Sequence, residues 1–124
     1  MRLLILIVAL LLITSCASIK TPYEYNFIVE ADASIGVAGT GSMLPMITPT
    51  STLFYKKVYS IDDIEINDVV YFKNPLNESK YIVHRCIYKV ENGCVTKGDN
   101  NPEVDKYVVK IEDIKYKVVG IWYD

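Results

Sequence analysis

The chain has 124 residues, of which 51% are hydrophobic and 23% charged, a composition typical of a single globular domain with a modest core. Its formal net charge of -2 leaves no basic surface, and its ten tyrosines follow no pattern suited to stacking on bases, so we expect no nucleic-acid partner. One histidine and a few separated cysteines do not make a ligand set, so we expect no metal site and no cofactor.

Residues 1–19 are a signal or anchor segment. Arg2 supplies a positive start, residues 3–13 are apolar without interruption, and small residues follow at 14–18. Eleven apolar residues are too few to span a bilayer. A count extended through Ile19 gives seventeen, which is the lower end of the transmembrane range.

The junction at residues 13–16, Ile-Thr-Ser-Cys, is similar to the lipobox at which bacterial lipoprotein precursors are cut. We therefore expect cleavage before Cys16 and lipid on Cys16, with an uncleaved membrane anchor as the alternative. In both cases the single positive residue before the apolar run keeps the N-terminus in the cytoplasm. Residues 20–124 then form a membrane-tethered domain on the extracytoplasmic side.

Residues 20–38 lead from this segment into the domain. Phe-Ile-Val at 27–29 predicts a short strand, because aromatic and β-branched residues favour extended structure. Residues 31–38 are small and predict a flexible connection, with Val37 and Ala38 already in a strand that leads to the next segment.

Residues 39–45, Gly-Thr-Gly-Ser-Met-Leu-Pro, predict a tight bend that exposes Ser42. The two glycines permit close approaches and backbone angles that a side chain would forbid, and Pro45 biases the residue before it away from helix. A chain presents a nucleophile in this way. On its own the pattern also fits a polar loop residue.

The next segments predict β-structure. Residues 52–58 form an apolar run that ends in charge, residues 60–66 suit a single helical turn, and residues 67–72 are strongly strand-forming. Asn67 opens the third segment, and asparagine is the residue other than glycine that best tolerates a left-handed turn.

Residues 80–90 alternate in polarity, which places His84 and Cys86 on one largely apolar face of a strand. The Asn92-Gly93 pair predicts a two-residue hairpin turn in which Glu91 faces Cys94. In this register His84 lies opposite Asn101. The histidine is therefore expected to neighbour the Gly-Asp-Asn-Asn segment at residues 98–101.

The same register directs Cys86 and Cys94 to opposite faces of the hairpin, so we expect both thiols to stay reduced. Two apolar runs at residues 108–111 and 117–123 predict the closing strands. The fold class expected is mainly β, compact and built of coiled antiparallel sheets.

Three blocks in this order, residues 39–45, Val-His-Arg at 83–85, and Lys-Gly-Asp-Asn-Asn at 97–101 followed by Asp105, resemble the type I signal peptidases. The likeness is to the branch of the endoplasmic reticulum and archaea, in which the serine is paired with histidine rather than lysine. It covers residues 39–120, and residues 20–124 would be the peptidase catalytic domain. Where the family usually has glycine, this chain has Asn67.

The resemblance implies a role for each residue. Ser42 is the nucleophile, and His84 is the general base, a role that suits imidazole because it titrates near neutral pH. Asp105 is the orienting acid and Asp99 a supporting acid, although both belong to one loop and the two could exchange roles. The Ser42 backbone N–H and the Thr40 hydroxyl would meet the oxyanion; the alternative for Thr40 is an ordinary strand threonine.

The implied substrate is an extended peptide or preprotein that adds along an exposed strand edge and is cut after small residues. Two other interpretations remain open. A self-cleaving domain like that of the SOS repressors shares the fold but uses lysine, and the leader argues against it. A non-catalytic lipoprotein module could keep the same fold for binding.

Overall fold

The computed structural model describes residues 30–36 and 39–123 of the chain. Residues 1–19 with Cys16, the strand predicted at 27–29, and Val37 and Ala38 lie outside the described residues. Among the described residues no helix is long and apolar enough to cross a bilayer.

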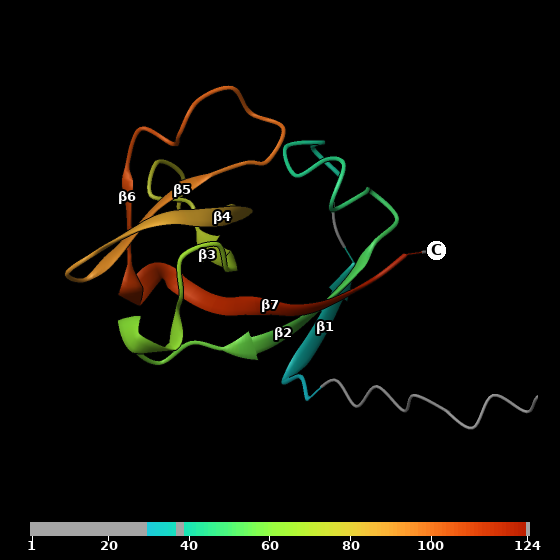
Figure 1. Ribbon diagram of the computed structural model, residues 1–124, viewed down its shortest axis with the longest axis horizontal. Helices are drawn as coiled ribbons and strands as arrows, with labels where there is room; N and C mark the ends of the chain where they lie inside the picture. Colours follow the sequence, from blue (N-terminus) through green and yellow to red (C-terminus); the bar gives the residue numbers. More distant parts are fainter. Residues whose placement is uncertain (1–29, 37–38, 124) are drawn as a thin grey trace, which may run out of the picture.

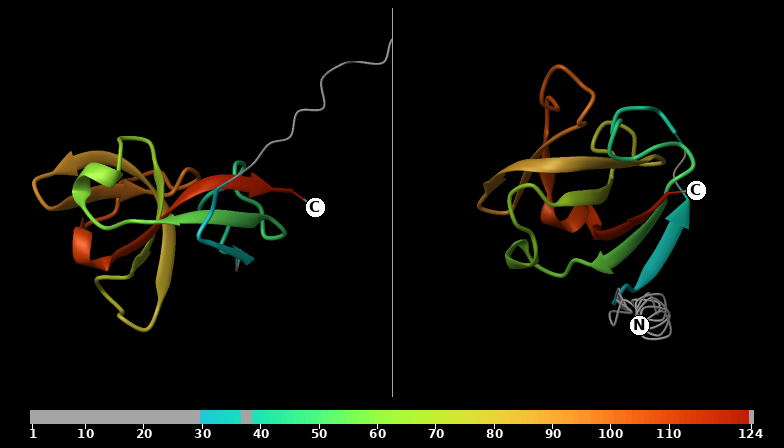
Figure 2. Two further views of the ribbon diagram at one scale, coloured as in Figure 1. Left: turned by 90° about the horizontal axis from the view of Figure 1, so that it is seen from below. Right: turned by 45° about the vertical axis from the view of Figure 1, so that its right-hand side comes forward.

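Seven strands form one antiparallel sheet that curls on itself into a half-barrel (Figures 1 and 2). In chain order the strands are β1 (Ala33–Gly36), β2 (Thr52–Lys57), β3 (Val69–Lys73), β4 (Tyr81–Val90), β5 (Gly93–Lys97), β6 (Val108–Lys110) and β7 (Ile114–Trp122). Their order across the sheet is β1-β2-β7-β3-β4-β5-β6. The prediction of a mainly β, coiled antiparallel fold is confirmed, with a single sheet in place of several.

Two 3₁₀ turns, η1 (Ile61–Asp63) and η2 (Ile111–Asp113), join strands. The predicted helical turn at 60–66 is thus confirmed as η1, and Asn67 has the predicted left-handed backbone, with a φ of 79°. Residues 33–36, which were expected to be part of a flexible connection, instead form β1 and pair with β2. The closing strand β7 begins earlier than predicted, at Ile114.

The curl of the sheet separates two hydrophobic clusters. One contains residues of β3 to β7 and the η1 region, namely Ile64, Val70, Phe72, Cys86, Cys94, Val109 and Ile114. The other joins the serine turn to β2 and β3 through Met43, Ile47, Leu53, Tyr55 and Val69. The second cluster therefore attaches the predicted nucleophile segment to the sheet.

The predicted turn of the β4–β5 hairpin is displaced by one residue, so that Val90 pairs two residues earlier on β5 than expected. Val90 pairs with Gly93, so Glu91 and Asn92 make the turn and Gly93 begins β5. A Cβ atom on Gly93 would lie 2.3 Å from the carbonyl oxygen of Val109, so glycine is needed here for the close approach of β6. The hairpin turn does not need the conformational freedom of Gly93, because Gly93 lies in the strand after the turn.

A register shift between Cys86 and Tyr88 changes which side chains face the core. Beyond it Tyr88 is 64% exposed, although the alternation predicted that it would share a face with His84. Cys86 and Cys94 are free, fully buried and in the same hydrophobic cluster, so the expectation that they point apart is wrong. The Cys86 thiol donates to Tyr88 O at 3.5 Å, and its interaction with the Cys94 thiol lowers the pKa of Cys86 and raises that of Cys94.

Candidate active site

The turn at residues 41–46 presents Ser42 at the edge of a pocket. Gly41 has a φ of 77°, which glycine adopts without strain. The turn is closed by hydrogen bonds from Leu44 N to Gly41 O at 3.2 Å and from Ile47 N to Met43 O at 2.9 Å. Because the side chains of Met43 and Ile47 are buried in the core, they anchor the turn directly after Ser42 and give the serine a defined position.

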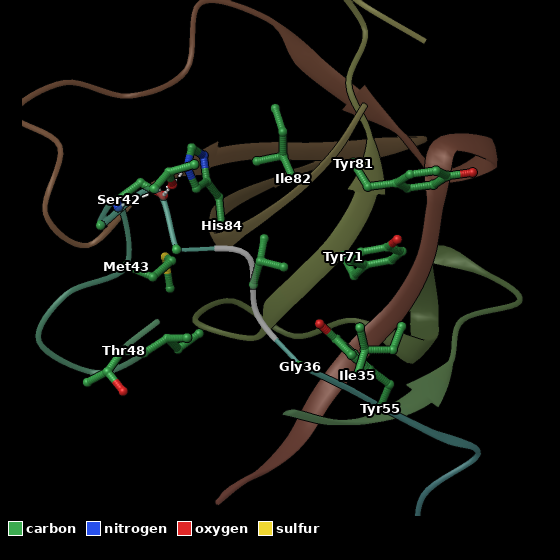
Figure 3. Close-up of a pocket in the computed structure, with 15 residues that line it drawn as sticks. Ile35, Gly36, Ser42, Met43, Thr48, Tyr55, Tyr71, Tyr81, Ile82 and His84 are labelled. Carbon is green, nitrogen blue, oxygen red and sulfur yellow. Dashed lines mark hydrogen bonds between the residues drawn. The ribbon is translucent and has the colours of Figure 1, made fainter. Parts of the chain in front are cut away.

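His84 lies on β4 and is only 7% exposed. Its Nε2 is 3.2 Å from Ser42 Oγ (Figure 3), and its Nδ1 is 2.7 Å from Asp105 Oδ2. An ionised carboxylate accepts the proton of Nδ1–H, which leaves the Nε2 lone pair directed at the serine hydroxyl. The three side chains thus form one hydrogen-bonded chain, at distances that permit proton transfer.

Asp105 is held in place by Thr96 of β5. The Asp105 N–H donates to Thr96 O at 2.8 Å, and the Thr96 hydroxyl donates to Asp105 Oδ2 at 2.6 Å. Sequence reasoning missed Thr96. The only hint in the sequence is that Thr96 is a polar residue in a predicted strand, just before residues 98–101. A polar side chain that is buried in a strand needs a hydrogen-bond partner.

Asp99 does not contact the imidazole. It forms a two-point ion pair with Arg85, with Nε to Oδ1 at 2.9 Å and Nη2 to Oδ2 at 2.7 Å. This pairing raises the pKa of Arg85 above its ordinary value. Arg85 also donates to Asn67 O at 2.8 Å, so Asp99 supports the strand beside His84 through the arginine.

The loop that follows β5 is hydrogen-bonded to the serine turn. Asn100 N donates to Ser42 O at 2.8 Å, and Asn100 Nδ2 donates to Gly41 O at 3.1 Å. A Cβ atom on Gly98 would lie 2.8 Å from Ser42 O, so only glycine allows this approach. In Figure 1 this loop and the serine turn lie beside one another.

The predicted pairing of His84 with Asn101 is therefore wrong. Arg85 pairs with Lys97, β5 ends there, and the Asn101 N–H turns back to Gly98 O at 3.0 Å. The box at residues 98–101 does lie near the histidine strand, but through this loop and its contacts with the serine turn. Asn100 is the second residue that sequence reasoning missed.

Thr40 lies next to the reactive atoms of Ser42. Its hydroxyl donates to Ser42 Oγ at 3.2 Å, and the Ser42 N–H points to the same threonine oxygen at 3.5 Å. The two groups predicted to meet an oxyanion therefore lie side by side. A carbonyl oxygen that approached Ser42 from the pocket could take both as hydrogen-bond donors.

A pocket of about 490 Å³ runs from Ser42 and His84 along the half-barrel (Figure 3). Its walls come from the segment leading to the serine, the serine turn, and strands β2, β3 and β4. Ile35, Ile82 and Val83 make the walls apolar, and three tyrosines lie at the end away from the serine.

Within the described part of the chain, no group of three or more histidine, cysteine or acidic residues could hold a metal ion. No protein-family model matches the chain, and no match is found among curated proteins or among solved structures.

Proposed function

We propose that this chain is a membrane-tethered serine endopeptidase, similar to the type I signal peptidases, which cuts signal-peptide-like extended substrates after small residues on the extracytoplasmic side. The observation that carries this proposal is the unbroken hydrogen-bond chain Ser42–His84–Asp105. It opens onto a pocket large enough for several residues of an extended peptide. The tether is the N-terminal segment with Cys16.

In the first half-reaction, Ser42 Oγ forms a bond to the scissile carbonyl carbon while its proton passes to His84 Nε2. The negative charge on the carbonyl oxygen is stabilised by the Ser42 N–H and the Thr40 hydroxyl. The C–N bond then breaks, and His84 returns the proton to the leaving amine. Water, activated by His84, releases the acyl group and restores Ser42.

Asp105 stabilises the imidazolium that forms in each half-reaction and keeps the imidazole in the required tautomer. Thr96 acts through Asp105, and Asn100 acts by holding the carbonyl groups of the serine turn. These are positioning residues, since neither reaches the substrate carbonyl.

The test uses the full chain, extracted in detergent, and a peptide with an Ala-X-Ala site. Ser42→Ala and His84→Ala should each reduce cleavage to the same floor, because members of one catalytic unit are not additive. Asp105→Asn should reduce kcat by orders of magnitude, about 10⁴-fold in a comparable triad.

Lys97→Ala is the matched control, because Lys97 is a neighbouring lysine whose ammonium bonds only to Gly98 O at 3.2 Å among the described residues. Loss of activity in Lys97→Ala with near-normal turnover in His84→Ala would assign the chain to the lysine enzymes. Binding of the peptide with no cleavage at any pH would instead favour a non-catalytic module. Cleavage confined to the chain itself would favour the self-cleaving class.

A further inference from the structure

Three tyrosines from three strands gather at the end of the pocket away from Ser42 (Figure 3). Tyr55 lies on β2, Tyr71 on β3 and Tyr81 at the start of β4. The ring centroids of Tyr55 and Tyr71 are 5.5 Å apart, and Tyr71 stacks on Tyr81 at 4.9 Å. The contacts between the rings order this end of the pocket before any ligand arrives.

The Tyr55 hydroxyl is a polar group left without a hydrogen-bond partner among the described residues. Tyr55 is 1% exposed and lines the pocket, yet its hydroxyl makes no hydrogen bond to any residue that the structure describes. Across residues 30–36 and 39–123, every fully enclosed side-chain nitrogen or oxygen has a partner, so the Tyr55 hydroxyl must reach the open pocket. The Tyr71 hydroxyl is also without a described partner and borders the same space.

The chemistry at this end of the pocket is neutral. Burial raises the pKa of Tyr55 and also that of Tyr71, so both hydroxyls stay protonated and can donate. None of the described residues that line the pocket is an aspartate, glutamate, lysine or arginine. A charged ligand group would lose its hydration there without a counter-charge, whereas a neutral polar group would gain a partner.

We propose that Tyr55 and Tyr71, with Tyr81 as an outer wall, form a subsite for a substrate side chain that has an apolar stem and a neutral hydrogen-bonding tip, such as glutamine. This inference rests on the proposed function. In an extended peptide, alternate side chains share a face. The subsite therefore reads a residue further from the cut than the small residue directly before it.

The experiment separates binding from cleavage by using the full chain with Ser42→Ala in detergent. Fluorescent peptides keep alanine directly before the cut and carry glutamine, methionine or glutamate at one position upstream at a time. Glutamine and methionine are nearly isosteric, so their difference in Kd reports the hydrogen bond. We expect one upstream position where glutamine binds roughly fivefold to tenfold more tightly than methionine, and where glutamate binds weakest.

Tyr55→Phe in the same background keeps the ring and removes the hydroxyl, so it should remove the preference for glutamine. The matched control is Tyr116→Phe. The Tyr116 ring packs on Tyr55 at 5.6 Å and on Tyr71 at 5.9 Å, but Tyr116 does not line the pocket, so its loss should leave the preference intact. Tyr71→Phe provides a second variant if Tyr55→Phe lowers the melting temperature.

The subsite is refuted if no upstream position prefers glutamine, if nothing binds, or if Tyr116→Phe has the same effect as Tyr55→Phe. Failure of the proposed function looks different. In that case the preference is present in the Ser42→Ala protein while the unmodified chain cuts none of the peptides. Efficient cutting without a preference overturns the subsite alone.

Discussion

A single oxygen of Asp105 accepts hydrogen bonds from two side chains, His84 at 2.7 Å and Thr96 at 2.6 Å. Asp105 thereby links the strand that carries the histidine to β5. Its side chain is only 11% exposed, so water competes little for these bonds. Hydrogen bonds to Asp105 and Ser42 fix the position of the imidazole. Asp99 does not take part, because its carboxylate is paired with Arg85.

At the same scale, Thr40→Val tests the oxyanion role of the threonine. Valine keeps the branched shape but has no hydroxyl, so we expect kcat to fall by about 10² to 10³ if the hydroxyl contacts the oxyanion. KM should change little, because the interaction strengthens only in the transition state. Steady-state kinetics on the Ala-X-Ala peptide measure both.

Thr40→Ser is the matched control, because serine restores the donor without the methyl group. It should recover most of the lost turnover. Equal losses in both variants would show that the methyl contact matters and would return Thr40 to the status of an ordinary structural residue.

At the scale of elements, the β4–β5 hairpin brings Cys86 and Cys94 into one buried cluster. We expect both thiols to be free and to react with a thiol label only after the protein unfolds. Both are fully enclosed, and the hydrogen bond with Cys86, together with burial, raises the pKa of Cys94 and makes its reactive thiolate scarce.

Mass spectrometry after labelling under non-reducing conditions, with and without denaturant, checks this expectation. The expected result is a label on both Cys86 and Cys94 in the denatured protein and on neither of them in the folded protein, each site being identified by its peptide. A pair of thiols missing from the denatured sample would mean that the two cysteines form a disulfide.

The η1 turn allows a test of stability against pH. The Asp63 carboxylate accepts hydrogen bonds from Tyr59 N at 2.8 Å and Ser60 N at 2.9 Å, and these lower its pKa below the ordinary value of 3.8. A lowered pKa in the folded state means that the carboxylate adds stability above 3.8. This contribution is lost as the pH falls through the lowered value.

Asp63→Asn should therefore reduce the free energy of unfolding near neutral pH, and the difference from the unmodified protein should shrink in acid. Urea unfolding followed by circular dichroism measures this. Asp62→Asn is the control, since the Asp62 carboxylate, in the same turn, bonds to no described residue. A difference for Asp63→Asn that stays constant with pH would mean that the carboxylate charge plays no part.

At the scale of the whole molecule, the sheet order brings together segments that are distant along the chain. The C-terminal end reaches the serine turn, where the Tyr123 hydroxyl donates to Met46 O at 2.6 Å. The loop after β5 contacts the same turn, where Asn100 N donates to Ser42 O at 2.8 Å. The serine turn is therefore held by contacts from the loop after β5 and from Tyr123, just after β7.

The proposed membrane tether also concerns the whole molecule. We predict that the mature protein begins at an acylated Cys16, because the apolar run is short and the cut would fall between Ser15 and Cys16 of the Ile-Thr-Ser-Cys junction. Diacylation at this cysteine would supply the two signals that stable anchoring needs. Mass spectrometry of the membrane-extracted protein should give the mass of residues 16–124 plus lipid. An intact Met1 terminus would instead indicate the uncleaved anchor.

Features determined by neighbouring residues could be predicted from the sequence. The strands from residue 52 onward, the 3₁₀ turn η1 and the left-handed Asn67 were predicted close to where the structure has them. Each depends on side-chain branching, local hydrogen bonds or the steric limits of one residue. These effects act between residues close together in the chain, so the order of residue types is enough to predict them.

What depends on segments meeting in space could not be predicted from the sequence. Gly93 looked like a turn residue, but it is needed because β6 passes over it. A bulge after Cys86 brings two cysteines together that strict alternation would separate. The choice of Asp105 over Asp99 at the imidazole follows from backbone and side-chain bonds to Thr96. Only the tertiary structure decided these features, because each follows from a contact whose partner lies on another strand or loop.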